Sequence, residues 1–474
     1  MKNKILDLTE GNITKNLIRL SLPIMLANFL QVFYNLTDTF WLGKLGDDAS
    51  KAVSAAGIAY PLVFFLSSFG AGFVISGTAL IAQYKGAGKP EEMKRVVGQY
   101  LLILCIFSAV FLPGVFLFID PILNILQVPA EIFIITKQYV SIILLGMVFM
   151  FIFMTYQSIS QGLGDTISPM KIQVISVLLN LVLDPLLIFG VGFIPRLETM
   201  GAAITTLVAR IMTAVFAVIF LIKKSKPVLP TQKDILPDKA MLKRIMSISI
   251  PASLGQSVTA FGFLLLQGFV NGFGTAVIAV FSISGRITGF FTMPAMGISS
   301  ALATVIGQNM GAGKMDRAKE SVKKAFVLVM TIMTAGCLVL FFFGGELTRF
   351  LIADPEVVEM GKRMFRILTF SSLAFGIVFV FMGVFNGSGH TKPSMILNVI
   401  RLWGLRIPFV LLLSGLAYKH FPIEFLKPVF DWFALPLSVH PYDALWWSMV
   451  ISNSVIALWA FLIYRRGKWQ KVRI

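Results

Sequence analysis

Two acidic residues, Asp38 and Asp184, lie deep inside apolar stretches of the chain. A carboxylate at the centre of a lipid bilayer costs roughly 2.5–3.5 kcal/mol on insertion scales, so such residues are functional candidates by default. Burial favours the neutral form of a carboxylic acid, which can then load and release a proton. Two carboxylates with an amide oxygen and a hydroxyl can equally bind Na+. The sequence therefore predicts a site for H+ or Na+ and leaves both ions open.

Each acid ends a polar stripe at helical spacing. The stripes consist of Gln31, Tyr34, Asn35 and Asp38, and of Gln173, Ser176, Asn180 and Asp184. These spacings place each set on one helix face. Such stripes can also do no more than join helices by hydrogen bonds, and for Asn35 or Ser176 alone that role stays open. An acid with an amide one turn before it, found twice, favours an ion site.

Prolines accompany both acids. Pro185 follows Asp184 and lacks an N–H, which frees a carbonyl group near Leu181. Pro23 lies about four turns before Asp38, and Pro251 is its counterpart later in the chain. We expect a bend at Pro23 that responds to the charge of Asp38, although silent prolines are common in membrane helices.

The composition predicts the elements that hold these residues. The chain of 474 residues is 57% hydrophobic and 14% charged, with a mean hydropathy of +0.83, whereas soluble domains are about a quarter charged. Apolar stretches of the length that crosses a bilayer predict an all-α integral membrane protein. The twelve predicted helices are 17–40, 52–82, 96–119, 133–160, 168–190, 201–222, 245–270, 278–308, 325–344, 367–387, 393–416 and 445–464.

The net charge of +18 sets orientation and does not indicate nucleic acid. With both termini inside, 27 basic residues fall in inner segments, 10 in outer segments and four within helices, as cytoplasmic loops require. Acidic residues show no such bias. The four are Arg210, Arg286, Arg401 and Arg406, whose roles stay open. Arg406 lies deep enough to be a charge partner, but snorkelling to an interface is the simpler expectation.

The remaining reactive residues predict little chemistry. Cys105 and Cys337 lie in apolar stretches, and the three histidines are far apart, so we expect neither a disulfide scaffold nor a metal cluster. The first twenty residues lack the features of a secretory signal. We expect them to lie on the inner membrane surface, where the apolar side chains Ile5, Leu6, Leu8 and Ile13 touch lipid.

The chain contains an internal repeat. Residues 78–97 align without a gap to 303–322 at an offset of 225, sharing a glutamine (Gln83 and Gln308) and the sequence GAGK. At the same offset, GLGDT (162–166) matches GSGHT (387–391). GAGK between two membrane helices favours a hairpin turn over a phosphate loop, which needs a strand before it.

The repeat predicts two six-helix lobes in one orientation, with the substrate site between them near the midplane. We expect an N-terminal lobe over 1–222, a cytoplasmic linker over 223–244 and a C-terminal lobe over 245–474. The acids are missing from the second copy, where Leu266 and Phe409 stand. This asymmetry favours an ion site in the N-terminal lobe.

Several of these segments resemble the multidrug and toxic compound extrusion (MATE) transporters. They are 22–46, 180–206, QGLGDT with the following Pro169, and 284–314 (SGRITGFFTMPAMGISSALATVIGQNMGAGK). The resemblance spans nearly the whole chain and recurs in both halves. It implies twelve helices in two pseudo-symmetric lobes around a V-shaped cavity, and efflux of cationic or amphipathic compounds driven by inward H+ or Na+.

The resemblance also implies roles for single residues. Asp38 and Asp184 match the paired acids of the N-terminal lobe in the DinF-like branch. The NorM-like branch has acids in helices 7 and 10, and the corresponding segments 245–270 and 367–387 contain none, which favours the DinF-like branch. Asn180 matches the amide beside the paired acids, and the threonine of the family pattern falls on Thr206, with Thr205 an alternative. These residues would bind the ion. The residues that match polar cavity positions are Gln31, Tyr34, Asn35 and Gln157.

We therefore expect a secondary antiporter that exports small organic compounds, without a cofactor, as a monomer in the cytoplasmic membrane. The alternative is a flippase of a lipid-linked precursor. A flippase of a pyrophosphate-bearing lipid would need basic residues in the cavity, whereas this N-terminal lobe has acidic ones. A membrane enzyme needs a clustered His/Asp or multi-Asp motif, and the sequence shows none.

Overall fold

A computed structural model of the chain describes residues 7–46, 49–192, 195–414 and 440–471. Within these residues, twelve helical spans are long and apolar enough to cross a membrane, which confirms the predicted number. They are α1 (Ile13–Leu42), α2 (Ala49–Gly86), α3 (Pro90–Ile125), α4 (Ala130–Gly162), α5 (Ile167–Phe189), α6 (Glu198–Lys224), α8 (Lys239–Asn271), α9 (Thr275–Gly311), α10 (Met315–Leu351), α11 (Pro355–Gly387), α12 (Thr391–Val399) continued by α13 (Ile407–Leu413), and α16 (Asp443–Arg465).

Local sequence explains where these helices begin and end. The side chain of Asn12 accepts a hydrogen bond from the Lys15 amide at 3.0 Å and caps α1. In both GAGK segments the second glycine takes a positive φ, +65° at Gly88 and +71° at Gly313, a conformation that glycine adopts without steric cost. The predicted hairpin turns are therefore confirmed.

One span is discontinuous in a way that its apolar pattern does not reveal. Between α12 and α13, the segment η3 (Ile400–Arg406) is a π-helix, and Pro408 follows in the first turn of α13. Arg406 is only 4% exposed. The expectation that it snorkels is wrong, because neighbouring side chains hold its guanidinium inside the bundle. The predicted end of this helix at 416 lies outside the described residues.

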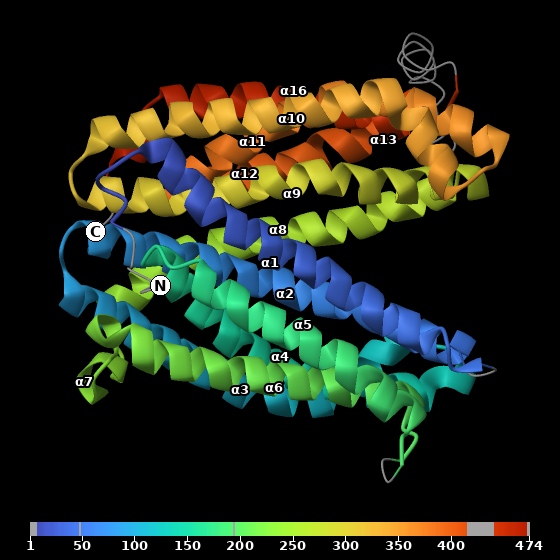
Figure 1. The fold of residues 1–474 in the computed structure, drawn as a ribbon, viewed down its shortest axis with the longest axis horizontal. Helices are drawn as coiled ribbons and strands as arrows, with labels where there is room; N and C mark the ends of the chain where they lie inside the picture. The colour runs from blue at the N-terminus through green and yellow to red at the C-terminus, as the bar shows by residue number, and fades with distance from the viewer. Residues whose placement is uncertain (1–6, 47–48, 193–194, 415–439, 472–474) are drawn as a thin grey trace, which may run out of the picture.

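The helices form two bundles (Figure 1), with α1–α6 below and α8–α16 above. Each bundle has an apolar core, and one such core in each is built from its own residues. The first turns of α1 are an exception, because Ile13, Leu17 and Leu20 belong to the core of the C-terminal half. The start of α8 likewise contributes Met241 and Ile245 to an N-terminal cluster. The two halves therefore cross at one end of the molecule.

The repeated glutamines join the two halves at that end. Gln83 on α2 donates a hydrogen bond from Nε2 to the Gly387 carbonyl at 3.0 Å. Gln308 on α9 donates in the same way to the Gly162 carbonyl at 2.8 Å. Gly86 packs directly on the Gln308 carbonyl, so a side chain at that position would collide with it. We call the two bonds of Gln83 and Gln308 the interlobe bonds.

The chain before α1 packs against protein, and the expectation that its apolar side chains touch lipid is wrong for the described ones. Leu8 is fully buried and Ile13 is 5% exposed. The Leu8 amide donates to Oε1 of Gln308 at 3.3 Å, and Asn309 donates to the Leu8 carbonyl at 3.2 Å. Side chains of α9 thus satisfy backbone groups that lipid would leave unpaired. Ile5 and Leu6 lie outside the described residues.

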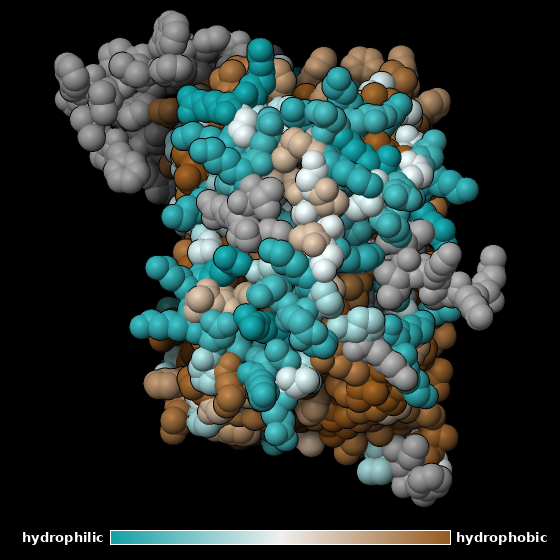
Figure 2. All heavy atoms as spheres, turned by 90° about the vertical axis from the view of Figure 1, so that its left-hand side faces the viewer, coloured by the Kyte–Doolittle hydropathy of each residue, from teal (hydrophilic) through white to brown (hydrophobic). Residues whose placement is uncertain are grey.

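The end face that carries both termini is rich in hydrophilic side chains (Figure 2). The loop between α2 and α3 and the loop between α9 and α10 lie at this end and contain Lys89 and Lys314. Apolar surface borders this face in the same view, as expected for a bundle that meets water at its ends and lipid along its sides.

Candidate coupling site

Three helices bring the two acids together. Asp38 lies in the last three turns of α1, and its carboxyl group is next to Asp184 and Asn180 of α5 and to Thr206 of α6. α5 packs against both α1 and α6. The four residues predicted for the ion site thus form one cluster, which we call the acid cluster.

The α5 side of the cluster is completely buried. Asp184 and Asn180 are both 0% exposed, and Nδ2 of Asn180 donates to Oδ1 of Asp184 at 3.3 Å. Their spacing of four residues places them on one face of α5. Pro185 lies within α5 directly after the acid. The amide and the acid are therefore in contact, and their role in binding an ion stays a prediction.

Both candidate threonines of α6 reach the cluster, but in different ways. Thr206 is 2% exposed and lies beside Asp38 and the hydroxyl of Tyr34. Thr205 lies near Asp184, and its Oγ1 donates to the Gly201 carbonyl of its own helix at 3.0 Å. Its hydroxyl hydrogen is therefore already engaged, and Thr206 has the hydroxyl that remains available.

The cluster contains buried oxygen atoms that lack a hydrogen bond among the described residues. They are Oδ1 of Asp38, Oδ2 of Asp184, Oδ1 of Asn180, Oγ1 of Thr206 and the hydroxyl oxygen of Tyr34. Buried polar atoms are normally paired, so each exception needs an explanation. Protons or a bound cation would satisfy this set, because oxygen atoms are the ligands that hard cations prefer.

The two polar stripes meet along their length. Nε2 of Gln173 on α5 donates to Oε1 of Gln31 on α1 at 3.0 Å, at an exposed position. Tyr34 is 7% exposed and lies inward of this pair. The side chain of Asn35 is outside the described ones. Gln157 lies on α4 and is half-buried, and none of the described contacts of the acid cluster includes it. Its assignment to the cavity stays a prediction.

An arginine side chain lies near the acid cluster. Arg210 follows Thr206 by one turn of α6 and is close to Asp38, Tyr34 and Tyr139. Its Nη1 donates to the Ile143 carbonyl of α4 at 2.9 Å, and within the described chain no ion pair joins it to either acid. The acids are therefore not locked by this arginine. Tyr139 was missed, because one tyrosine in an apolar helix gives no periodic signal.

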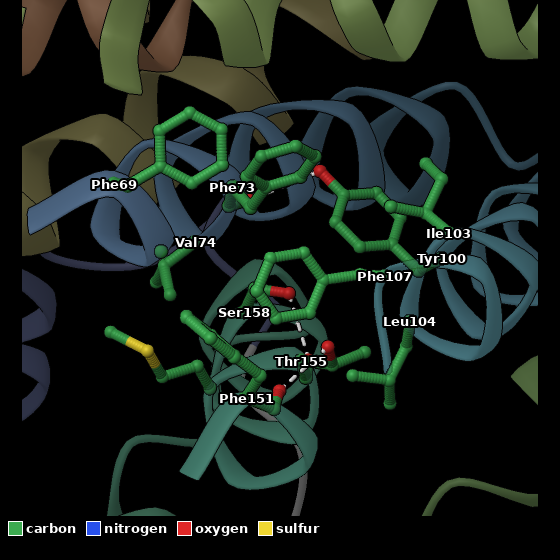
Figure 3. Close-up of a pocket in the computed structure, with 12 residues that line it drawn as sticks. Phe69, Phe73, Val74, Tyr100, Ile103, Leu104, Phe107, Phe151, Thr155 and Ser158 are labelled. Carbon is green, nitrogen blue, oxygen red and sulfur yellow. Dashed lines mark hydrogen bonds between the residues drawn. The ribbon is translucent and has the colours of Figure 1, made fainter. Parts of the chain in front are cut away.

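A pocket lies elsewhere in the N-terminal half, between α2, α3 and α4 (Figure 3). Aromatic rings from all three helices line it, among them Phe73, Tyr100 and Phe151. Its polar groups are hydroxyls such as those of Thr155 and Ser158, and none of the predicted site residues lines it. The apolar lining of this pocket fits hydrocarbon groups and has no ligands for an ion, so we assign ion binding to the acid cluster.

The comparison with known proteins identifies the family. The MatE family model matches residues 23–186 and 251–412, one segment in each half. The chain belongs to the MATE family. Residue 23 and residue 251 are the paired prolines of α1 and α8, so the two matched segments begin at the same point of the repeat.

Individual MATE proteins match along nearly their whole length. The chain is 27% identical over 472 residues to the probable multidrug resistance protein YpnP of Bacillus subtilis, covering 99% of each protein. It is 27% identical to the multidrug export protein MepA of Staphylococcus aureus, covering 96% of this chain and 94% of that protein. A crystal structure of MATE in complex with MaL6 matches the fold with a TM-score of 0.84 at 24% identity, covering 98% of each chain.

MATE proteins are transporters that act on small molecules and need no cofactor. The protein is therefore a multi-pass membrane transporter and not an enzyme, as predicted. The twelve-helix MATE fold expected from the sequence is confirmed.

Proposed function

We propose that the protein is a secondary antiporter of the DinF-like branch that exports organic cationic or amphipathic compounds in exchange for inward H+ or Na+. Relatives named as multidrug resistance and multidrug export proteins support the class of substrate. Within the described residues, α8 and α11 contain no acid in the segments 245–270 and 367–387, which supports the branch. We expect a monomer in the cytoplasmic membrane with both termini in the cytoplasm.

The observation that carries the proposal is the acid cluster with its unpaired oxygen atoms. Two buried carboxylates side by side repel each other when both are charged. Either a proton or a sodium ion removes that repulsion and allows α1 and α5 to approach. When the ion leaves, charge returns to the cluster and the helices separate again. This is how an ion can bias the conformation of the N-terminal lobe.

The substrate would enter beside the cluster. Gln31 is exposed on α1, and Tyr34 lies one turn closer to Asp38. With Asn35 and Gln157 these residues are the proposed polar contacts of the substrate. Pro23 lies inside α1, and the missing hydrogen bond at a proline lets a helix bend there. A bend at Pro23 would carry the change at Asp38 to the far end of α1.

The test is dye efflux from reconstituted vesicles under an imposed pH gradient and, separately, an imposed sodium gradient. Asp38→Asn keeps the shape of the side chain and removes its charge, so we expect coupled efflux to fall to the background while the protein stays folded. Asp120→Asn is the matched control, because Asp120 pairs at 2.7 Å with Lys137 at a half-exposed position far along α3. Full efflux by Asp38→Asn would contradict the proposal.

The same assay distinguishes the two ions. If sodium is coupled, Asp184→Asn and Asn180→Ala lose more efflux under the sodium gradient than under the pH gradient, because both remove an oxygen ligand. Equal losses under both gradients indicate protons alone. No efflux by the unmodified protein under either gradient would overturn the antiporter proposal.

A further inference from the structure

Two arginines of the C-terminal half are buried and have no acidic partner among the residues that the structure describes. Arg401 is 3% exposed and Arg406 is 4% exposed, and both lie on the π-helical segment η3. Buried charges in proteins are normally paired, because an uncompensated ion in a low-dielectric interior is strongly destabilising. Short π-helical segments occur frequently at functional sites.

Neutral groups hold Arg406 in place. Its Nε donates to Oγ of Ser452 at 3.2 Å, and its Nη2 donates to Oδ1 of Asn453 at 2.9 Å. Nδ2 of Asn453 donates in turn to Oγ of Ser371 at 2.9 Å. These contacts fix the orientation of the guanidinium, but they bring no negative charge.

Arg401 is less well satisfied. Its Nη2 lies 3.4 Å from Oδ1 of Asn398, and its guanidinium lies 4.5 Å from the centre of the Phe375 ring. Its buried Nε has no hydrogen-bond partner among the described residues. Arg401 is also close enough to Arg406 for their charges to repel.

The acid on the neighbouring helix is already engaged. Asp443 of α16 forms an ion pair with Arg363 at 2.6 Å. In the part of the chain that the structure describes, no ion pair includes Arg401 or Arg406. Within the described ranges, the pair therefore has two positive charges, an N–H donor of Arg401 without an acceptor, and no counter-charge.

The internal repeat relates Arg401 to a residue of the N-terminal half that lies near the acid cluster. At the offset of 225, Arg401 corresponds to Ser176 and Asn398 corresponds to Gln173, both on the polar stripe of α5 that ends at Asp184. Arg406 corresponds to Leu181, which lies outside that stripe, so the repeat places Arg401 alone on the face that carries the acid in the N-terminal half. In the first half this face lies beside the acid cluster, so in the second half it is the corresponding place for a ligand of opposite charge.

We propose that Arg401 and Arg406 form an anion subsite that binds a carboxylate or phosphate group of the transported compound. Guanidinium groups bind both anions through paired, charge-assisted hydrogen bonds. The subsite would extend the range of substrates to zwitterionic and anionic amphiphiles. This proposal rests on the proposed export function. The π-helical segment and Pro408 weaken the regular hydrogen-bond ladder at this point, which lets the segment move to admit the group.

The test measures binding of rhodamine B, which carries a carboxylate, and of its ethyl ester, which does not. The protein is placed in phosphatidylcholine nanodiscs, so binding is measured without transport. We expect Arg401→Gln to weaken the binding of rhodamine B at least tenfold and to leave the ester within twofold. Arg401→Lys should retain most of the preference. Arg286→Gln is the control, because Arg286 is an exposed arginine of α9.

The carboxylate comparison separates a binding role from a merely structural one. Equal affinities of the unmodified protein for the acid and the ester would overturn the proposal, and so would an equal loss of both ligands in Arg401→Gln. Nanodiscs containing phosphatidylglycerol identify the source of the anion. If that lipid competes with rhodamine B in the unmodified protein but not in Arg401→Gln, the subsite binds a phosphate head group.

The outcome is independent of ion coupling. Asp38→Asn should bind rhodamine B with unchanged preference for the acid over the ester, even where it no longer exports dye. If the unmodified protein shows no ion-coupled efflux but still prefers rhodamine B to the ester, the antiporter proposal is wrong and the anion subsite stands. If it exports dye but shows no such preference, only the anion subsite is wrong.

Discussion

Thr205 and Thr206 are neighbours in the sequence, yet their hydroxyl groups have different environments. Oγ1 of Thr205 donates to the Gly201 carbonyl at 3.0 Å, while Oγ1 of Thr206 is buried without a partner among the described residues. Valine has the shape of threonine without the hydroxyl. A hydrogen bond or ligand contact to a charged group contributes about 1.5–3 kcal/mol, which corresponds to roughly tenfold or more in affinity.

We therefore predict that Thr206→Val lowers ion-coupled efflux roughly tenfold at a limiting ion gradient. The measurement is the initial rate of dye efflux as the gradient is varied. Thr205→Val is the control and should change the rate by less than twofold, because the volume is kept and the hydroxyl of Thr205 donates to the Gly201 carbonyl of its own helix. The opposite ranking of the two variants would assign the site to Thr205.

Helical spacing was sufficient to find most of the acid cluster. Asp38, Asn180 and Asp184 were predicted because a charge or amide in an apolar helix stands out, whereas the contact of Gln31 with Gln173 was not predicted. Spacing could not show which helices pack together. It therefore left Thr205 and Thr206 unresolved, and it missed Tyr139 of α4, which lies near Asp38 only in the folded bundle.

The interlobe bonds are a feature of the elements rather than of the acid cluster. Nε2 of Gln83 and Nε2 of Gln308 each reach a carbonyl at the end of a helix in the other half. At about 1 kcal/mol for each bond, the two together stabilise contact at this end by about 2 kcal/mol. Their loss shifts the equilibrium towards a state that is open there by roughly thirtyfold.

We predict that Gln83→Ala combined with Gln308→Ala opens the end that carries the termini. The reporter is Ser388→Cys, a nearly isosteric change at a residue that is 0% exposed beside Gly387, in a chain with Cys105 and Cys337 replaced by alanine. A maleimide should label this cysteine slowly with the glutamines present and much faster without them. The same rate in both would show that these bonds do not hold the end closed.

The control for this prediction is Gln99→Ala. Nε2 of Gln99 donates to the carbonyls of Asp234 and Leu236, both at 2.8 Å, and so ties α3 to the linker instead of to the other lobe. Oε1 of Gln99 also accepts from the Asp238 amide, as Oε1 of Gln308 accepts from the Leu8 amide, so each variant loses three bonds at the same end of the molecule. We expect the Ser388→Cys reporter to be labelled at the original slow rate.

Hydropathy predicted the helices themselves, since each predicted range falls largely within an observed one. It did not predict the π-helical segment η3 or the short helix α7 (Gln232–Ile235), because both depend on local hydrogen bonds that apolar composition does not specify. It was wrong about Leu8 for a related reason. A short apolar segment beside a membrane fits lipid or a protein surface equally well, and only the partners of its backbone groups decide.

The whole molecule has two ends of different charge. The inner segments of the expected topology contain 27 basic residues and the outer segments 10, and the termini lie together at the hydrophilic end (Figure 2). Because Lys and Arg are retained on the cytoplasmic side, this end should face the cytoplasm. The interlobe bonds lie at the same end, so the conformation described here is closed towards the cytoplasm in that orientation.

This orientation predicts opposite labelling at the two ends. Val191 is 55% exposed after α5, and Asp316 is fully exposed at the start of α10. In intact cells, an impermeant maleimide should label Val191→Cys and spare Asp316→Cys, while permeabilised cells should show both. The reverse pattern would place the basic end outside. The interlobe bonds would then close the extracellular side, and ions entering the cell would have to reach the acid cluster from the end that carries the termini.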